Sequence, residues 1–456
     1  MDAGIDAGPP AKPDAGPDAG FDAGADAGPD AGLDAGPDAG PPDAGPPLPY
    51  DDAGFGPFCT LPGAVIYTDA GVTIVPGAVG QPDFSWLTIP VGFCVHHYAN
   101  VPNARQIRFA PGGELFVASP STGTVSGGPG GLAAIVVVPD DNQDGQGDQT
   151  LTFKGSLPST VGMLFANGVF YHQEGTEIVS QPYIPGQVVD NGLDAPVADI
   201  TVYKSSTHWP KTLDVSDTGN LFVGNGGDDG AACAQPMPFQ GGVLQLDGTD
   251  GGTQVVMGLR NPIAVKCHHD GNDQCFAVEL GKDFSSDEGG REKLLLIHPG
   301  DDWGFPCCAS ANLPYTGTTV PCAGNPSQQC PPDCSGVVQD TNSFLIGNTP
   351  FGFDFVDDQF PAPWGNRVIV ALHGAFETWL GARLVAIAID PTTGLLLPSS
   401  TRDGGDLGNI VDFAVGWADG TLSHGRPTDV EMSPDGRLFI SNDQNGEIFW
   451  IAPNVP

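Results

Sequence analysis

The segment RPTDVEMSPDGRLFISNDQ at 426–444 decides the fold. Apolar and polar residues alternate on both sides of Pro-Asp-Gly, which is the pattern of two antiparallel β-strands joined by a tight turn. A further apolar stretch, GEIFWIAP at 446–453, follows at once and reads as a third strand. The segment therefore predicts a small antiparallel sheet of at least three strands.

The same pattern recurs along the chain. The other two-strand segments are ARQIRFAPGGELFVAS from 104, TVGMLFANGVFYHQEG from 160, TLDVSDTGNLFVGNGG from 212, NPIAVKCHHDGNDQCFAVELG from 261 and PFGFDFVDDQFPAPWGNRVIVALHG from 350. The matching third strands begin near 132, 177, 241, 293 and 382. Six copies of one sheet predict an all-β, six-bladed β-propeller. In that architecture, residues just before or after the inner strands lie at the end of the central channel where chemistry is usually found.

Composition agrees with this fold class and limits the partners. The 66 Gly and 45 Pro suit short strands joined by turns, and 40% apolar residues are enough for a core. The net charge of −39, from 55 acids against 16 Lys and Arg, argues against nucleic acid or an anionic membrane as a partner. No run of 18 apolar residues occurs, so no membrane span is expected.

A four-residue repeat of the type Pro-Asp-Ala-Gly fills residues 13–46. Gly and Pro break both helix and strand, and a regularly repeated Asp extends the chain by repulsion. We therefore expect a disordered linker over 1–57 and the propeller over 58–456, with a cysteine-rich insertion at 307–334. The linker is interpreted as a spacer that holds the domain off a cell surface; a neutral low-complexity tail is the alternative.

The ten cysteines are an even number, typical of an oxidising compartment. Cys267 and Cys275 flank a turn that would place them opposite each other in a hairpin. Cys59 and Cys94 are expected to tie the end of the linker to the first blade. The other six leave 15 pairings open. Zinc is the alternative role for them, although Cys-x-x-Cys is absent.

Several segments, spread over roughly residues 90 to 453, resemble the quinoprotein glucose/sorbosone dehydrogenases, and the sorbosone-type branch most closely. The first similar segment, PVGFCVHHYANVPNARQIRFAPGGELFVA from 90, resembles the family's opening blade. The others are GLRNPIAV at 258–265, EKLLLIHPGDDWGFP at 292–306, VIVALHGAFE at 368–377 and GRPTDVEMSPDGRLFISND at 425–443. Pro-Asp-Gly hairpins recur in many propellers, so the order and spacing of these segments carry the resemblance. In that family pyrroloquinoline quinone (PQQ) binds on the channel together with calcium.

The resemblance assigns the catalytic roles. His208, in STHWPKTLDV, matches the base that takes the proton of the substrate hydroxyl while hydride passes to the quinone, and an imidazole titrates in the right range for that task. Asp228 matches the acid that orients this histidine, and Arg260 the cation that polarises the quinone carbonyl. The alternatives are a strand-capping histidine, a turn aspartate and an arginine that locks a turn between blades.

The resemblance also assigns the binding roles. Asn261, His373 and Arg426 match cofactor-binding positions, and a guanidinium suits a cofactor carboxylate. The backbone carbonyls of Gly281 and Lys282 match the calcium ligands, although the lysine cation there is a mild contradiction.

Two departures weaken the prediction of an enzyme. LPSTVGMLF at 157–165 stands where the glucose branch has a Gly-x-x-Gly-Leu-Leu-Gly loop, and Thr428 replaces the second closing arginine of that branch. Fewer cationic groups mean a weaker hold on a tricarboxylate cofactor.

The segment PDDNQDGQGDQ at 139–149 is a second candidate metal site. It has the alternating oxygen side chains of a calcium loop, without the glutamate that normally closes one. Its candidate ligands are Asp140, Asn142, Asp144 and Asp148. A solvated acidic turn is the alternative.

The sequence thus favours a monomeric, extracytoplasmic dehydrogenase of a sugar hydroxyl, with PQQ and calcium as cofactors and a separate periplasmic electron acceptor. Two alternatives remain. One is a non-catalytic recognition propeller on a surface stalk, whose channel residues would be too scattered to hold a cofactor. The other is a calcium-dependent lactonase, which would begin from Glu279 and Asn261.

Overall fold

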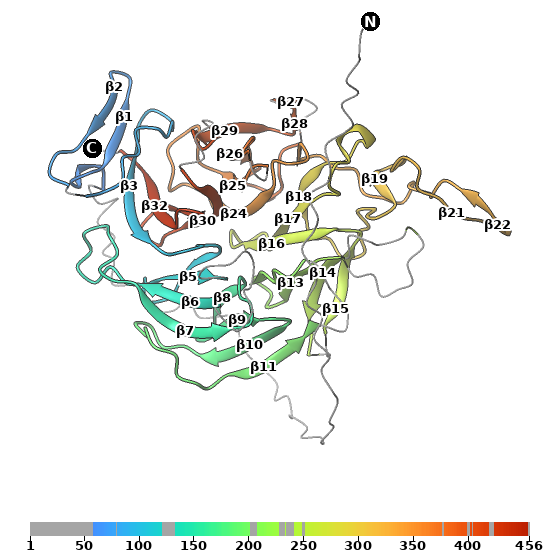
Figure 1. The fold of residues 1–456 in the computed structure, drawn as a ribbon, viewed down its shortest axis with the longest axis horizontal. Coiled ribbons are helices and arrows are strands. Elements are labelled where there is room, and N and C mark those ends of the chain that lie inside the picture. Colours follow the sequence, from blue (N-terminus) through green and yellow to red (C-terminus); the bar gives the residue numbers. More distant parts are fainter. Residues whose placement is uncertain are drawn as a thin grey trace, which may run out of the picture. The chain divides into compact units, whose positions relative to one another are not determined.

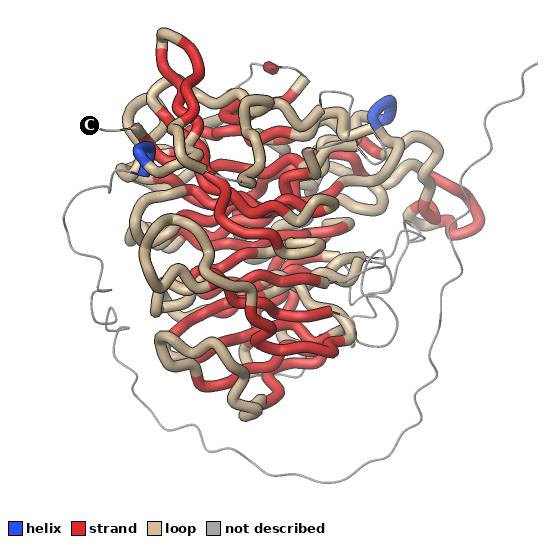
Figure 2. Tube along the Cα trace, turned by 60° about the vertical axis from the view of Figure 1, so that its left-hand side comes forward, coloured by secondary structure: helices blue, strands red, loops and turns tan. Residues whose placement is uncertain are grey.

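The structure is a computed structural model. It describes residues 58–78, 80–120, 133–200, 208–227, 233, 241–248, 251–375, 378–398, 402–403, 405–418 and 424–454. Strands dominate this part of the chain (Figure 2), and the helical segments described are the 3₁₀ turns η1 (Phe58–Thr60) and η3 (Ser286–Glu288). Within these ranges no helix has the length and apolar character needed to cross a membrane.

The first three blades are four-stranded antiparallel sheets. From the innermost strand outward, blade 1 contains β4 (Ile107–Phe109), β5 (Leu115–Ser119), β6 (Ala133–Val138) and β7 (Leu151–Leu157). Blade 2 contains β8 (Met163–Ala166), β9 (Val169–Glu174), β10 (Glu177–Pro182) and β11 (Ala195–Asp199). Blade 3 contains β12 (Leu213–Val215), β13 (Leu221–Asn225), β14 (Gly242–Leu246) and β15 (Thr253–Met257).

The last three blades follow the same order, and two of them carry extra strands. Blade 4 contains β16 (Asn261–His268), β17 (Gln274–Leu280), β18 (Glu292–Leu296) and β23 (Ser343–Phe344), extended by β28 (Asp406–Leu407) and β27 (Arg402–Asp403). Blade 5 contains β24 (Pro350–Val356), β25 (Arg367–Leu372), β26 (Arg383–Ala388) and β29 (Ile410–Val415). Blade 6 contains β30 (Arg426–Met432), β31 (Leu438–Asp443), β32 (Glu447–Pro453) and β3 (Phe93–Asn100), extended by the hairpin β1 (Val65–Thr68) and β2 (Gly71–Ile74).

The six blades close into a ring (Figure 1). Each inner strand contacts the inner strand of the next blade, from β4 through β8, β12, β16 and β24 to β30, and β30 returns to β4. The ring is fastened by β3, an N-terminal strand that pairs with β32 and so completes the last blade, with Phe93 opposite Pro453. Chain closure therefore joins the two ends of the propeller through backbone hydrogen bonds.

The hydrophobic core is divided among the six interfaces between blades. One buried apolar cluster lies between each pair of neighbours. Strand β6 shows how the sequence produces this: Val136 and Val138 join the cluster shared with blade 6, whereas Ile135 and Val137 join the one shared with blade 2. Alternate side chains of a strand point to opposite faces, so a strand covered on both faces reads as a continuous apolar run.

Side chains on the channel side bind the blades together as well. The carboxylate of Asp214 accepts the Cys267 N–H of the next blade at 2.9 Å, and that of Asp429 accepts the Ile107 N–H of blade 1 at 3.0 Å. Asp429 and Glu431 also pair with Arg108 at 3.1 and 3.0 Å. Buried charges within the ring are thus paired across blade boundaries.

All ten cysteines form disulfides. The two predicted bridges, Cys59–Cys94 and Cys267–Cys275, are confirmed, and the zinc alternative is excluded. The pairing left open by the sequence is Cys233–Cys307, Cys308–Cys334 and Cys322–Cys330. These three hold the insertion, whose strands are β19 (Cys308–Ser310), β20 (Leu313–Pro314), β21 (Val320–Cys322) and β22 (Asn325–Cys330).

The sequence predictions of fold are confirmed for every blade. All six two-strand segments and all six third strands occur where the pattern placed them. The fourth strands were not predicted, and β3, assigned by resemblance to the opening of the first blade, belongs to the last. The expected linker lies outside the described residues.

Candidate functional site

Several of the sequence-predicted residues lie at the same end of their blades. In an antiparallel hairpin, the start of the inner strand lies beside the end of the second strand. Arg426 therefore faces Asp443, and Asn261 faces Leu280. His208 and Arg260 precede inner strands, and His373 follows a second strand. These residues therefore belong to the same end of their blades.

A buried carboxylate, Asp443, organises one side of this end. Its Oδ2 lies 2.8 Å from His373 Nε2, 3.1 Å from Arg105 Nη2 and 3.2 Å from Arg426 Nη2. Arg426 Nε adds a second contact, 3.3 Å to Oδ1. The structure therefore brings His373 and Arg426 together through Asp443 and adds Arg105; the sequence reasoning missed both Asp443 and Arg105.

The protonation states of this cluster follow from burial and charge. Burial lowers the pKa of His373 to about 4, so near neutral pH the imidazole is uncharged and donates its Nε2–H to Asp443. Burial alone would raise the pKa of Asp443, but the bond from His373 and the guanidinium groups of Arg105 and Arg426 hold it below its usual range. Two cations thus surround one anion, which leaves the cluster positive.

Aromatic rings support both guanidinium groups. Arg105 lies 4.8 Å from the Phe351 ring centre, and Arg426 lies 4.8 Å from that of Trp379. A guanidinium over a ring face is attracted to it, and its planar orientation is restricted. The positive charge is therefore held in a fixed place.

Arg260, which precedes the inner strand of blade 4, has a separate set of contacts. Its backbone N–H donates to Glu279 Oε1 at 2.9 Å, and its Nη1 donates to the Gly281 carbonyl at 3.0 Å. Its Nη2 pairs with Asp283 at 2.6 Å. Glu279 is also bound by Lys293 at 3.0 Å, so both of its oxygens are used structurally. A lactonase centre built on Glu279 receives no support from this arrangement.

His208 is linked to Arg260 through the backbone of one residue. His208 Nδ1 lies 2.7 Å from the Gly227 carbonyl, and the Gly227 N–H donates to the Arg260 carbonyl at 2.6 Å. Because a carbonyl only accepts, Nδ1 carries the hydrogen, and Nε2 of a neutral His208 holds the lone pair. The neighbouring Gly226 has no room for a side chain, since a Cβ there would come 2.1 Å from that of His208.

Asp228, predicted to orient His208, lies outside the described residues, and its role stays a prediction. In the described part of the chain, the Gly227 carbonyl binds Nδ1. Arg105 had a detectable signal, because an arginine stands at the start of the inner strands of blades 1, 4 and 6. Aligning the six repeats by their inner strands would have found it.

The predicted calcium carbonyls each hold a hydrogen-bond donor. Gly281 O accepts from Arg260, and Lys282 O accepts from Ser285 Oγ at 2.5 Å. The Lys282 ammonium points instead to Glu288, 3.3 Å away, and lies over the Tyr315 ring at 4.4 Å. Each carbonyl thus accepts one hydrogen bond in this structure, and calcium there stays a prediction.

The acidic loop at 139–149 is held by its own backbone. Asp140 accepts the N–H groups of Asp144 and Gly145 at 3.0 and 3.1 Å, and Asp148 accepts those of Asp141 and the Asn142 side chain, both at 2.7 Å. Such bonds shape an acidic turn without an ion. Calcium binding at this loop also stays a prediction.

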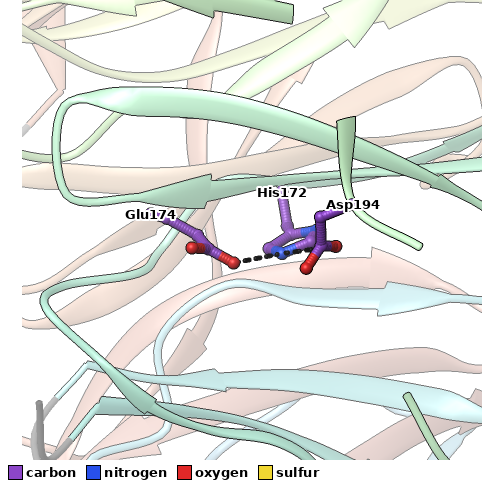
Figure 3. A group of neighbouring side chains, drawn as sticks. All are labelled: His172, Glu174 and Asp194. Atoms are coloured by element: carbon purple, nitrogen blue, oxygen red, sulfur yellow. Dashed lines mark hydrogen bonds and ion pairs between the residues drawn. The ribbon is translucent and has the colours of Figure 1, made fainter. Parts of the chain in front are cut away.

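A further group of potential metal ligands lies in blade 2 (Figure 3). His172 Nε2 is 3.0 Å from Glu174 Oε1 and 4.0 Å from Asp194 Oδ1. Lys154 of blade 1 reaches the same two carboxylates, at 2.8 Å from Glu174. An ammonium therefore already neutralises this cluster, which we interpret as an ion pair between blades.

No family model and no curated protein matches the sequence. Solved structures do resemble the fold. The iodide structure of a Trichoderma reesei enzyme of carbohydrate-active family AA12 matches with a TM-score of 0.63 and 17% identity, over 83% of this chain and 99% of that one. The holo PQQ domain of pyranose dehydrogenase from Coprinopsis cinerea matches with a TM-score of 0.62 and 15% identity, over 82% and 98%.

A bacterial structure resembles the fold too. The PQQ-bound aldose sugar dehydrogenase of Streptomyces coelicolor matches with a TM-score of 0.51 and 16% identity, over 80% of this chain and 99% of that one. The matches span nearly the whole of each solved chain. The chain therefore has the six-bladed propeller fold of the PQQ-dependent sugar dehydrogenases.

Proposed function

We propose that the chain is a quinoprotein oxidoreductase that oxidises a sugar hydroxyl with PQQ as the acceptor. The observation that carries this proposal is the connection His208–Gly227–Arg260. The Gly227 carbonyl orients the base, and the Gly227 N–H binds the backbone carbonyl of Arg260, so one residue links the base to the residue that carries the cation. Alcohol oxidation by hydride transfer needs this pair of groups.

His208 acts as the base. Its Nδ1–H is fixed on the Gly227 carbonyl, so Nε2 is the nitrogen that takes the hydroxyl proton of the substrate. When bound, PQQ supplies the two-electron acceptor for the hydride. Arg260 places a buried positive charge at this end, and such a charge stabilises an oxygen on which negative charge develops. We also propose that Asp228 orients His208 and that calcium binds with the cofactor; the proton transfer to His208 depends on neither.

The channel end suits an anionic cofactor. Three arginines stand there at the start of inner strands: Arg105, Arg260 and Arg426. Among the buried side-chain polar atoms that lack a hydrogen-bond partner in the described residues, Arg105 Nε and Asn261 Oδ1 belong to residues at this end. Buried polar atoms are normally paired, so a ligand bound here would satisfy these two. Arg105 and Arg426 would hold carboxylates, with His373 positioning Asp443 between them.

The disulfides are typical of an extracytoplasmic protein. We propose that the substrate is a sugar and that a separate electron acceptor reoxidises the cofactor in the periplasm, at the surface or outside the cell. The monomeric state predicted from the sequence is part of this proposal.

The test is a titration of purified, calcium-loaded protein with PQQ, followed by dye reduction across a panel of aldoses. Micromolar or tighter binding, with turnover lost in His208→Ala, supports the dehydrogenase. His298→Ala is the matched control, because its side chain is 68% exposed and lies outside the channel cluster. Absence of binding at millimolar PQQ would overturn the proposal in favour of a recognition propeller.

A further inference from the structure

The turn that follows β17 presents an unusual aromatic residue. Phe284 is 96% exposed, a larger exposed fraction than that of any other large apolar residue among the described residues. Its backbone has φ of 57°, in the left-handed region that bulky residues rarely adopt. The chain therefore holds a large apolar ring in water on a strained backbone, and the ring contributes almost no burial to the fold.

The surrounding turn is built firmly. Ser285 is buried and donates its hydroxyl to the Lys282 carbonyl at 2.5 Å, while its own carbonyl accepts the Glu288 and Gly290 N–H groups at 3.0 and 2.8 Å. Lys282 is braced by the Tyr315 ring of the cysteine-rich insertion, 4.4 Å away. The strained residue is thus fixed by its neighbours, and strain of this kind is concentrated at functional positions.

The turn also borders the candidate site directly. Asp283, the residue before Phe284, binds Arg260 at 2.6 Å and is itself 63% exposed. Arg260, by contrast, is only 7% exposed. Phe284 therefore stands at the rim, one residue away from a group that contacts the candidate catalytic arginine.

The chemistry of the rim suits a saccharide. Sugar rings have an apolar face of C–H groups that packs on an aromatic ring, and hydroxyls at their edges that bind carboxylates and hydroxyl groups. The exposed polar neighbours of Phe284 are Asp283, Ser286 and Asp287. One ring face with polar groups beside it is the arrangement that such a ligand needs.

We propose that Phe284 is a stacking platform for the sugar ring next to the one that reacts, so that the preferred substrates are saccharides of two or more rings. This inference rests on the proposed dehydrogenase function. The reacting ring would lie at the buried channel end near Arg260, and the next ring would extend outward to the rim.

The experiment compares wild type, Phe284→Gly and Phe284→Trp, loaded with PQQ, on glucose, maltose, cellobiose and the two corresponding trisaccharides. Phe284→Gly removes the ring and suits the positive φ, so we expect an unchanged unfolding midpoint. KM for the di- and trisaccharides should rise about three- to ten-fold with kcat unchanged, while glucose is unaffected. Phe284→Trp should keep the wild-type preference. Ile184→Ala, an exposed apolar residue of blade 2, is the control.

An equal KM in Phe284→Gly for all sugars would overturn the inference while leaving the proposed function intact. A loss confined to reduction of a protein electron acceptor would also overturn it, and would assign Phe284 to partner docking. If wild type binds no PQQ, the proposed function fails, and a second measurement still tests whether Phe284 binds a sugar ring. The fluorescence of Phe284→Trp is titrated with both trisaccharides in cofactor-free protein: a saturable change supports the platform, and a flat response rejects it.

Discussion

Asp443 Oδ2 lies 2.8 Å from His373 Nε2, and this bond joins the end of β31 in blade 6 to the end of β25 in blade 5. The same carboxylate binds Arg105, which precedes the first strand of blade 1. One buried anion therefore connects three consecutive blades across the point where the ring closes. The candidate cofactor arginines are positioned by an acid that no motif singled out.

Replacing Asp443 with asparagine should destabilise the protein. The buried Arg426 and the partly buried Arg105 would remain beside a neutral amide, and breaking a buried pair from one side costs about 3–5 kcal/mol. Urea unfolding at pH 7 measures the difference. Asp412→Asn is the control, because Asp412 is 61% exposed and its pair with Arg383 should be worth about 1 kcal/mol or less. Equal effects for the two substitutions would contradict the role given to Asp443.

His373 makes the stability of the fold depend on pH. Its pKa is lowered to about 4 by burial, beside Asp443, Arg105 and Arg426, so between pH 6.5 and 4 the unfolded chain binds a proton that the folded chain does not. Stability should therefore fall as pH falls through this window, by about 3 kcal/mol from this group. His373→Gln keeps a donor for Asp443 and does not titrate. The free energy of unfolding of wild type minus variant, measured from pH 7 to 4, should decline; a constant difference would exclude the effect.

The repeated two-strand pattern predicted the fold because each copy of it is contained in a short stretch of sequence. Each blade contains two strands joined by a short turn, so its signature lies within about twenty residues, as in 426–444. The fourth strands lie outside this two-strand segment, and those of blades 4 and 6 come from distant parts of the chain. β3 is the extreme case, because it pairs with β32 more than 300 residues away, and its own sequence does not indicate which strand it pairs with. The pairing of Cys233 with Cys307 was open for the same reason.

Only the site residues that lie within recognisable sequence motifs could be predicted. Arg260, Asn261 and Arg426 stand in recognisable segments, and the ring of blades brings their positions to one end. Asp443 and Gly227 act through contacts between blades, which a linear pattern does not encode. Phe284 was missed because its significance lies in a backbone angle and an exposed fraction, and the sequence specifies neither.

The close approach of Gly226 to His208 gives a test of the catalytic geometry. A Cβ at 226 would come 2.1 Å from the Cβ of His208 and 2.9 Å from its carbonyl oxygen, so Gly226→Ala must displace the histidine. We expect kcat to fall at least about ten-fold, because small displacements of a reacting group are costly, while PQQ affinity changes little. Gly336→Ala has open space around it and should retain wild-type activity. Unchanged kcat in Gly226→Ala would show that the position of His208 is not critical.

The Cys233–Cys307 bridge should contribute more stability than the Cys322–Cys330 bridge. The first links residues 74 positions apart and ties the insertion to blade 3, whereas the second closes a separation of 8 within a single hairpin. A longer closed loop restricts the unfolded chain more, by about 2 kcal/mol for this difference. Paired Cys→Ser variants of each bridge, compared by urea unfolding, measure this difference in stability.

Because Tyr315 of the insertion contacts Lys282, two residues before Phe284, loss of the Cys233–Cys307 bridge should also raise KM for disaccharides. Loss of the second should not, since β21 and β22 form a sheet of their own. Equal KM values would mean that the insertion holds its place through packing alone.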